Sequence, residues 1–191
     1  MIRFGHVPEP AGFAGKAMRH GAKWLADHPS AKRPHDYWSE FKPALADGFK
    51  QLCGYSVLYE PVGTVDHFVS WDEDKSRAYD WSNLRFASAW LNSSKKSVRS
   101  VEILDPFDVQ DGWFEILLPS LQLTVSSAVP REYLARARNV LTRLHLGHDE
   151  RVMRQRREWY RMYQAGELTL EGLRKRAPLI AVAVDAASLA G

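Results

Sequence analysis

The 191-residue chain contains a single cysteine, has no apolar run long enough to span a membrane, and has little net charge. One cysteine excludes an internal disulfide framework and a zinc site built from several thiolates. The first residues lack the apolar stretch of a signal peptide, so we expect a cytoplasmic protein with no membrane partner. A net charge of +3 and a pI near 9.0 permit nucleic-acid binding without establishing it.

The chain also lacks internal repeats and low-complexity tracts, and its 45% hydrophobic content suffices for a real core. Apolar residues recur mostly at helical spacing, with two strand-like stretches joined by a Pro-Ser turn. We therefore expect an α+β fold. Helices are predicted at residues 14–26, 37–51, 131–146, 148–164, 170–176 and 179–189, and a hairpin at 113–118 and 121–125.

The residues suited to chemistry are concentrated in one segment, 63–96, which contains Asp66, His67, Asn83 and Asn92. Hydrolysing a phosphodiester requires a base for water, a hard divalent cation and oxygen ligands for that cation. His67 can be the base, because imidazole titrates near neutral pH. Asp66 and Asn92 supply one anionic and one neutral oxygen, which suits Mg²⁺ or Mn²⁺.

Local patterning predicts how these side chains are presented. β-branched and aromatic residues bounded by Gly and Pro predict a hairpin between residues 52–59 and a second strand ending at His67. A charged loop follows. Asp80 or Ser82 can then cap a helix over residues 83–94.

This order resembles the HNH endonuclease family and its ββα-metal motif. The resemblance covers roughly residues 50–107, including the Leu-Asp-Pro-Phe sequence at 104–107, and is closest to free-standing bacterial HNH proteins. It implies a core at residues 52–107, packed between N-terminal helices at 1–51 and a short hairpin with helices at 108–191. We expect the three segments to form one compact unit.

Carried over residue by residue, the resemblance implies that His67 is the general base and that Asp66 and Asn92 bind the metal. Asn83 would bond backbone groups across the loop and orient the base. Nine residues of ideal helix amount to about half a rotation, so Asn83 and Asn92 cannot both face one ion from a helix. Asn83 is therefore interpreted as a loop or cap residue. Lys95, with Lys96 beside it, is expected to reach a phosphate.

The chain departs from many HNH proteins at the zinc knuckle, a pair of Cys pairs that braces the motif. Cys53 is the only cysteine at the matching positions. We therefore expect no structural zinc and bracing by packing of Trp81, Phe86 and Trp90. Asp105, which precedes a proline, is expected to form an Asx-type turn and is assigned no chemistry.

Basic residues are concentrated late in the chain, with twelve Lys or Arg against six Asp or Glu between Arg131 and Arg176. On a helix over residues 149–164, Arg154, Arg157 and Arg161 share one face. Basic faces are common in ordinary domains, so a solvated helix face is the first interpretation and a DNA-tracking stripe the second.

The resemblance predicts a Mg²⁺- or Mn²⁺-dependent DNA endonuclease. Proteins of this appearance often serve antiviral defence in bacteria, so an ATPase or another defence-system partner is an expectation by analogy. Two alternatives stay open. One is a non-catalytic nucleic-acid-binding or scaffold module with a degenerate HNH fold, and the other is an RNase toxin, because the site reads phosphate more than sugar.

Overall fold

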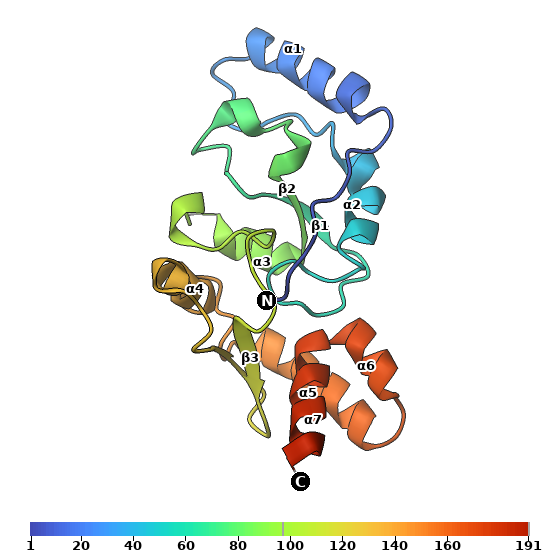
Figure 1. The fold of residues 1–191 in the computed structure, drawn as a ribbon. Helices are drawn as coiled ribbons and strands as arrows, with labels where there is room; N and C mark the ends of the chain where they lie inside the picture. The colour runs from blue at the N-terminus through green and yellow to red at the C-terminus, as the bar shows by residue number, and fades with distance from the viewer. Residues whose placement is uncertain (97, 191) are drawn as a thin grey trace.

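The computed structural model describes residues 1–96 and 98–190, and these form an α+β fold in which two small antiparallel sheets lie among helices (Figure 1). The first sheet pairs β1 (Thr64–His67) with β2 (Leu84–Ala87). The second pairs β3 (Phe114–Leu117) with β4 (Gln122–Val125). The two sheets occupy different parts of the molecule, each with its own helices.

The N-terminal helices lie around the first sheet. A π-helical turn (Ala14–Met18) leads into α1 (Arg19–Asp27), which confirms the helix predicted at 14–26. The helix predicted at 37–51 is shorter: a 3₁₀ turn (Ser39–Phe41) precedes α2 (Lys42–Gly48). It stops because Lys50 and Gln51 adopt positive φ angles, which no α-helix accommodates.

The hairpin and helix predicted around the motif were misplaced. Residues 52–59 are not a strand, and they contribute only one isolated bridge between Leu52 and Tyr59. The partner of β1 is β2, which lies inside the segment predicted as a helix, and α3 (Ala89–Lys95) starts only after it. All four β2 residues are buried, so pairing and packing outweighed their helical spacing. The observed order is strand, long loop, strand, helix.

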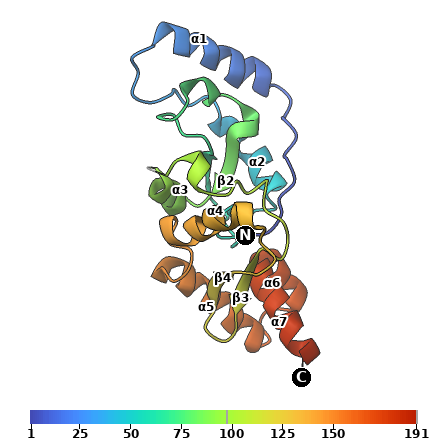
Figure 2. The same cartoon turned by 60° about the vertical axis from the view of Figure 1, so that its left-hand side comes forward.

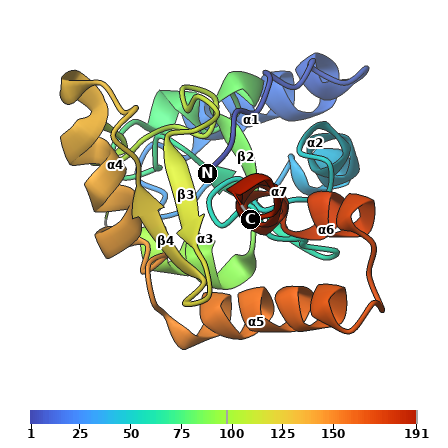
Figure 3. The same ribbon diagram turned by 60° about the horizontal axis from the view of Figure 1, so that its bottom comes forward.

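The C-terminal part matches its predictions more closely. The hairpin is formed by β3 and β4, and the helices are α4 (Arg131–Arg143), α5 (Glu150–Gln164), α6 (Leu170–Arg176) and α7 (Pro178–Ala190). The helix predicted at 131–146 ends early, at Arg143. Figures 2 and 3 show α7 beside β3 and α5 running along one side of this part.

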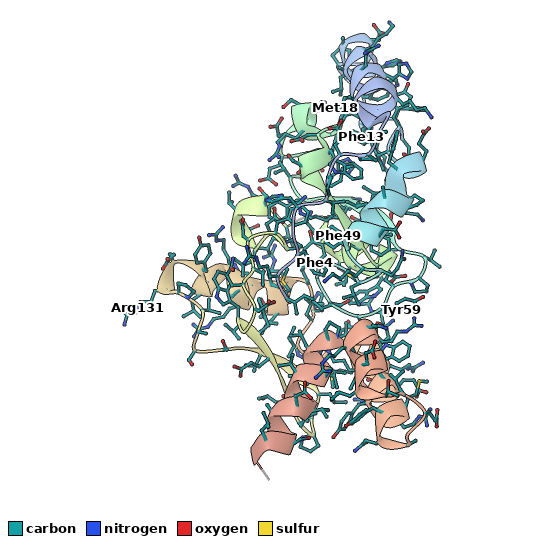
Figure 4. All side chains as sticks on the ribbon, turned by 45° about the vertical axis from the view of Figure 1, so that its right-hand side comes forward. Phe4, Phe13, Met18, Phe49, Tyr59 and Arg131 are labelled. Atoms are coloured by element: carbon teal, nitrogen blue, oxygen red, sulfur yellow. The ribbon has the colours of Figure 1, made fainter. Side chains whose placement is uncertain are left out.

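The two parts share one connected set of buried hydrophobic residues, which extends from Met1 to Val184. The N-terminal segment contributes to it, with the ring of Phe4 packed 4.7 Å from that of Phe49 (Figure 4). Two long-range bonds secure the motif segment: Trp81 Nε1 donates to the Val7 carbonyl at 2.8 Å, and the Tyr59 amide donates to the Arg176 carbonyl at 2.8 Å. Across the described residues, no helix combines the length and apolarity that crossing a bilayer would need.

Candidate functional site

Asp66 is a buried carboxylate on β1, with 2% of its surface exposed. The Tyr55 hydroxyl donates to its Oδ2 at 2.6 Å, and the Lys95 ammonium donates to its Oδ1 at 3.1 Å. Burial raises the pKa of Tyr55 well above its usual value, and the charge of Asp66 raises it further. The phenol therefore stays protonated and holds the carboxylate in one orientation.

Lys95 lies in the last turn of α3, where it is as buried as Asp66. Besides Asp66, its ammonium donates to the carbonyls of His67 at 2.6 Å and Phe68 at 3.0 Å. An ammonium has three donors, and all three have protein acceptors. This corrects the expectation that Lys95 reaches a phosphate: it balances the charge of Asp66 and ties α3 to the end of β1.

His67 ends β1 with its ring fixed on two sides. Its Nε2 lies 2.8 Å from the Ala78 carbonyl, and the Trp38 ring meets it edge-on with centroids 4.5 Å apart. A carbonyl can only accept, so Nε2 carries the proton and Nδ1 presents a lone pair in the neutral ring. Burial lowers the pKa of His67 despite the opposing effect of the Ala78 carbonyl. The ring is thus neutral near pH 7, which is the form that accepts a proton.

Asn83 is a loop residue, as predicted, and it closes the long segment between β1 and β2. It lies in a 3₁₀ turn (Trp81–Asn83) that Asp80 caps. Its Oδ1 accepts from the Val69 amide at 2.8 Å, and its Nδ2 donates to the carbonyls of Val69 and Arg77, each at 3.0 Å. These bonds fix the chain on both sides of Ala78, whose carbonyl holds His67. Asn83 therefore positions the base through the backbone.

Asn92 connects α3 to β1. Its Nδ2 donates to the Val65 carbonyl at 3.1 Å, and its Oδ1 accepts no hydrogen bond from the described residues. Asn92 and Lys95 are three residues apart, so they share the face of α3 that is turned to β1. The structure holds Asn92 against the Val65 carbonyl, one residue before Asp66 on β1. Alternation along β1 directs Asp66 toward α3, whereas His67 lies on the opposite face, toward Trp38.

No protein-family model matches this chain, and no curated protein matches it. The interpretation of the site therefore depends on its geometry and on the resemblance carried by the motif.

The types of oxygen that Asp66 and Asn92 offer suit a hard divalent cation. Each Asp66 oxygen accepts one hydrogen bond and keeps a second acceptor position, and the Asn92 amide oxygen is free of protein donors. Carboxylate and amide oxygens are ligands that Mg²⁺ and Mn²⁺ prefer. Among the described residues no three His, Cys, Asp or Glu side chains cluster as a metal cage. A Mg²⁺ site with two protein ligands does not need such a cage, because waters and phosphate oxygens complete the coordination.

Hydrogen bonds and close packing hold the segment around Cys53 against β2. The Ser88 amide donates to Cys53 Sγ at 3.4 Å, and the Gly54 amide donates to the Phe86 carbonyl at 2.8 Å. Gly63 crosses so close to the Phe86 ring that a Cβ there would lie 2.1 Å from it. These contacts hold residues 53–54 directly against the end of β2.

A second buried ion pair lies next to the site and was not foreseen. Arg85 of β2, paired with Asp66 in the strand register, makes a bidentate ion pair with Asp105. The predicted Asx turn is confirmed, because the Phe107 amide donates to Asp105 Oδ1 at 3.0 Å. The Arg85 guanidinium also covers the Phe107 ring at 3.9 Å. Asp105 thus anchors the segment after α3 to β2.

The surface arginines of α5 differ in whether their charges are already paired with an acidic side chain. Arg157 pairs with Glu150, and Arg161 pairs with Glu158 and Glu167. Arg154 is exposed and makes no ion pair with the described residues, and the same is true of Lys96 after α3. Of the predicted nucleic-acid contacts, these two have charges free for a phosphate.

Sequence reasoning missed three contributors to the site: Tyr55, the Ala78 carbonyl and Trp38. Each contacts the motif across a long loop or from another element. No spacing rule in the sequence signals such contacts.

Proposed function

We propose that this protein is a metal-dependent endonuclease of the HNH type that hydrolyses phosphodiester bonds in DNA. The observation that carries the proposal is the state of His67 at the end of β1. Its Nε2 proton is committed to the Ala78 carbonyl, and burial keeps the ring neutral, so that Nδ1 can accept a proton. A base with a pKa below its usual value, prepared in this way, suits general-base chemistry near neutral pH.

In the proposed reaction, Nδ1 of His67 removes a proton from water. The water oxygen bonds to phosphorus while the bond to the leaving oxygen breaks, and the proton stays on the ring. The positive charge that forms on His67 is favoured by the negative charges of Asp66 and Asp36 and disfavoured by the Lys95 ammonium. A Mg²⁺ or Mn²⁺ ion held by Asp66 and Asn92 would neutralise charge on the phosphate.

Lys95 shapes how that ion would bind. Its ammonium already compensates Asp66, so a divalent cation adds charge to a locally neutral site. We infer that a substrate phosphate contributes the remaining negative charge and strengthens metal binding. Metal affinity without nucleic acid should then be low.

The buried Lys95–Asp66 pair also supports one alternative, a non-catalytic module in which Asp66 is purely structural. An RNase is a further alternative, because the site recognises phosphate more than sugar. The family analogy also extends the proposal to antiviral defence with an ATPase partner, and that step depends on analogy alone.

The test is incubation of the purified chain with plasmid, single-stranded DNA and total RNA in Mg²⁺, Mn²⁺ or EDTA. We expect cleavage of DNA that EDTA abolishes and that His67→Ala lowers by roughly 10²- to 10⁴-fold. His148→Ala, an exposed histidine outside the site, is the control and should retain full activity. Nicking that survives His67→Ala contradicts the base assignment. Absence of all cleavage favours the non-catalytic module, and cleavage of RNA alone favours the RNase.

A further inference from the structure

A continuous series of aromatic rings starts at His67 and leads away from the candidate site. The Trp38 ring packs on His67, and Tyr79 lies next, with its centroid 5.8 Å from that of Trp38. Tyr37 follows at 5.9 Å from Tyr79. These inner rings belong to, or pack against, the hydrophobic core.

The outer end of the series has a different character. His35 lies 4.5 Å from Tyr37, and Trp24 lies 6.3 Å from His35 in a stacked orientation. Trp24 also stacks on His28 at 4.7 Å and contacts Trp71 at 6.5 Å. We name Trp24, His28, His35 and Trp71 the stacking platform. All four side chains are partly or fully exposed.

The platform is assembled from three separate segments. Trp24 is on α1, the two histidines follow α1, and Trp71 belongs to the β1–β2 segment, which lies alongside α1 in Figures 1 and 2. The Lys75 ammonium donates to the carbonyls of Pro29 and Ala31, and the Tyr79 hydroxyl donates to the His35 carbonyl at 2.9 Å. The rings are therefore held in place before any ligand arrives.

Core packing does not account for the two tryptophans. The partly buried residues that pack on the core include Tyr37 and Trp38, but neither Trp24 nor Trp71. Among the described residues, the rings of Trp24 and Trp71 contact each other, and Trp24 also contacts the two histidines. The Lys75 ammonium lies 5.1 Å from the centre of the Trp71 ring. Partly exposed tryptophans outside the core have ring surface left for contact with a ligand.

The surroundings of the platform favour an anionic ligand. Residues 16–36 contain five Lys or Arg and three His against two Asp. Asp27 is paired with Lys23, and Asp36 accepts from the amides of Trp38 and Ser39, whereas Lys32 and Arg33 are exposed and form no ion pair with the described residues. Of the acids that follow Trp71, Glu73 accepts from the Ser100 amide and Asp74 caps a 3₁₀ turn, while Asp72 is exposed. Partly exposed rings interleaved with cations are the pattern of single-strand binding, in which bases stack and the backbone follows positive charge.

We propose that the stacking platform binds the unpaired bases of a single-stranded nucleic acid. This inference rests on the proposed nuclease function and adds its substrate class. A duplex does not fit the platform, because its bases are already stacked on each other and present only their edges.

The experiment measures binding of nucleic acid in EDTA, so that the readout does not depend on cleavage. Fluorescence anisotropy of the full chain is recorded with labelled single-stranded DNA, RNA of the same sequence, and the corresponding DNA duplex. We expect single strands to bind at least ten-fold more tightly than duplex. Trp24→Ala and Trp71→Ala should each weaken single-strand binding by about 5- to 150-fold, the loss of one stacked base.

Two variants serve as controls. Trp24→Phe keeps a stacking ring and should recover most of the affinity. Tyr163→Ala removes a ring from α5 in the C-terminal part and should leave binding unchanged. Thermal unfolding of every variant shows whether it is folded. A second readout needs no variant: 2-aminopurine in the bound strand should be quenched by stacking on the wild-type protein.

Equal affinity for duplex and single strand, or unquenched 2-aminopurine, overturns the platform. Retained affinity in both folded Trp→Ala variants overturns it as well. Tight, Trp-dependent binding without any cleavage keeps the platform and rejects the nuclease. Cleavage that is indifferent to Trp24 and Trp71 rejects the platform alone.

Discussion

The ammonium of Lys95 lies 3.1 Å from a carboxylate oxygen of Asp66, and both side chains are only 3% exposed. The pair therefore joins the last turn of α3 to the strand that carries the candidate base. Removing one partner of such a pair leaves an uncompensated charge inside the protein. The site and the stability of the fold are linked through this contact.

Lys95→Met should test that link directly. The substitution keeps most of the side-chain volume but leaves the Asp66 carboxylate, among the described residues, with the Tyr55 hydroxyl as its one side-chain donor. We expect the free energy of unfolding to fall by about 3–5 kcal/mol, measured by urea denaturation. Lys96→Met changes the exposed neighbour and should stay within about 0.5 kcal/mol of the wild type. An unaltered urea midpoint for Lys95→Met would show that the buried pair is absent in solution.

Tyr55→Phe removes the single hydroxyl that donates to Asp66 Oδ2. We expect a loss of about 1–3 kcal/mol in the free energy of unfolding, because a buried acceptor loses its partner. Catalytic rate or Mg²⁺ affinity should fall by roughly 10- to 100-fold, since supporting bonds orient metal ligands. Tyr59→Phe is the matched control, because the Tyr59 hydroxyl makes no hydrogen bond to the described residues. Equal effects of the two substitutions would count against an orienting role for Tyr55.

The stability of the metal-free protein should depend on pH through His67. Burial places its pKa in the folded chain below 6.5, the value expected for the unfolded chain. Above pH 6.5 both states are neutral and the histidine adds no pH dependence. As the pH falls below 6.5, the unfolded state binds the proton first, so the folded state is progressively destabilised.

Thermal unfolding in EDTA between pH 7.5 and pH 5 measures this effect. The wild-type melting temperature should fall more steeply toward acid than that of His67→Gln, which cannot titrate. Carboxylates common to both proteins contribute equally and cancel in the comparison. Parallel curves would indicate that His67 is not desolvated in the folded protein.

Arg154 and Arg157 provide a test of the basic face of α5. Arg154 is unpaired within the described residues, whereas Arg157 is held by Glu150. If this face contacts phosphates, Arg154→Ala should lower DNA affinity and reduce the slope of log K against log salt by about 1. Arg157→Ala should change the slope less. Salt titrations in which both variants match the wild type would identify the face as solvated surface.

Local rules predicted the features that depend on neighbouring residues. Helical geometry alone indicated that Asn83 and Asn92 cannot both bind one ion from the same helix. In the structure, Asn83 lies in a turn before β2. The Asx turn at Asp105 and the hairpin of β3 and β4 also follow from local sequence. In each case the decisive contacts span only a few residues.

The features that were not predicted from the sequence depend on packing between distant segments of the chain. Residues 84–87 have helical spacing but pair with β1 because that pairing buries all four side chains. The sequence predicts that Lys95 reaches a phosphate, and only the position of Asp66 across the fold explains why Lys95 is buried. Trp38 and Tyr55 contact the site from other segments of the chain. No periodic pattern in the sequence predicts that these segments lie close to it.

The bonds from Trp81 to Val7 and from Tyr59 to Arg176 have a consequence for how this protein can be divided. The span 59–95, which contains the candidate base and metal ligands, obtains supporting contacts from Val7 near one end of the chain and from Arg176 near the other. Such a span is not a portable module that could be excised or grafted with its geometry intact. Truncation at either end would therefore remove contacts that support the candidate site without removing the candidate base or metal ligands.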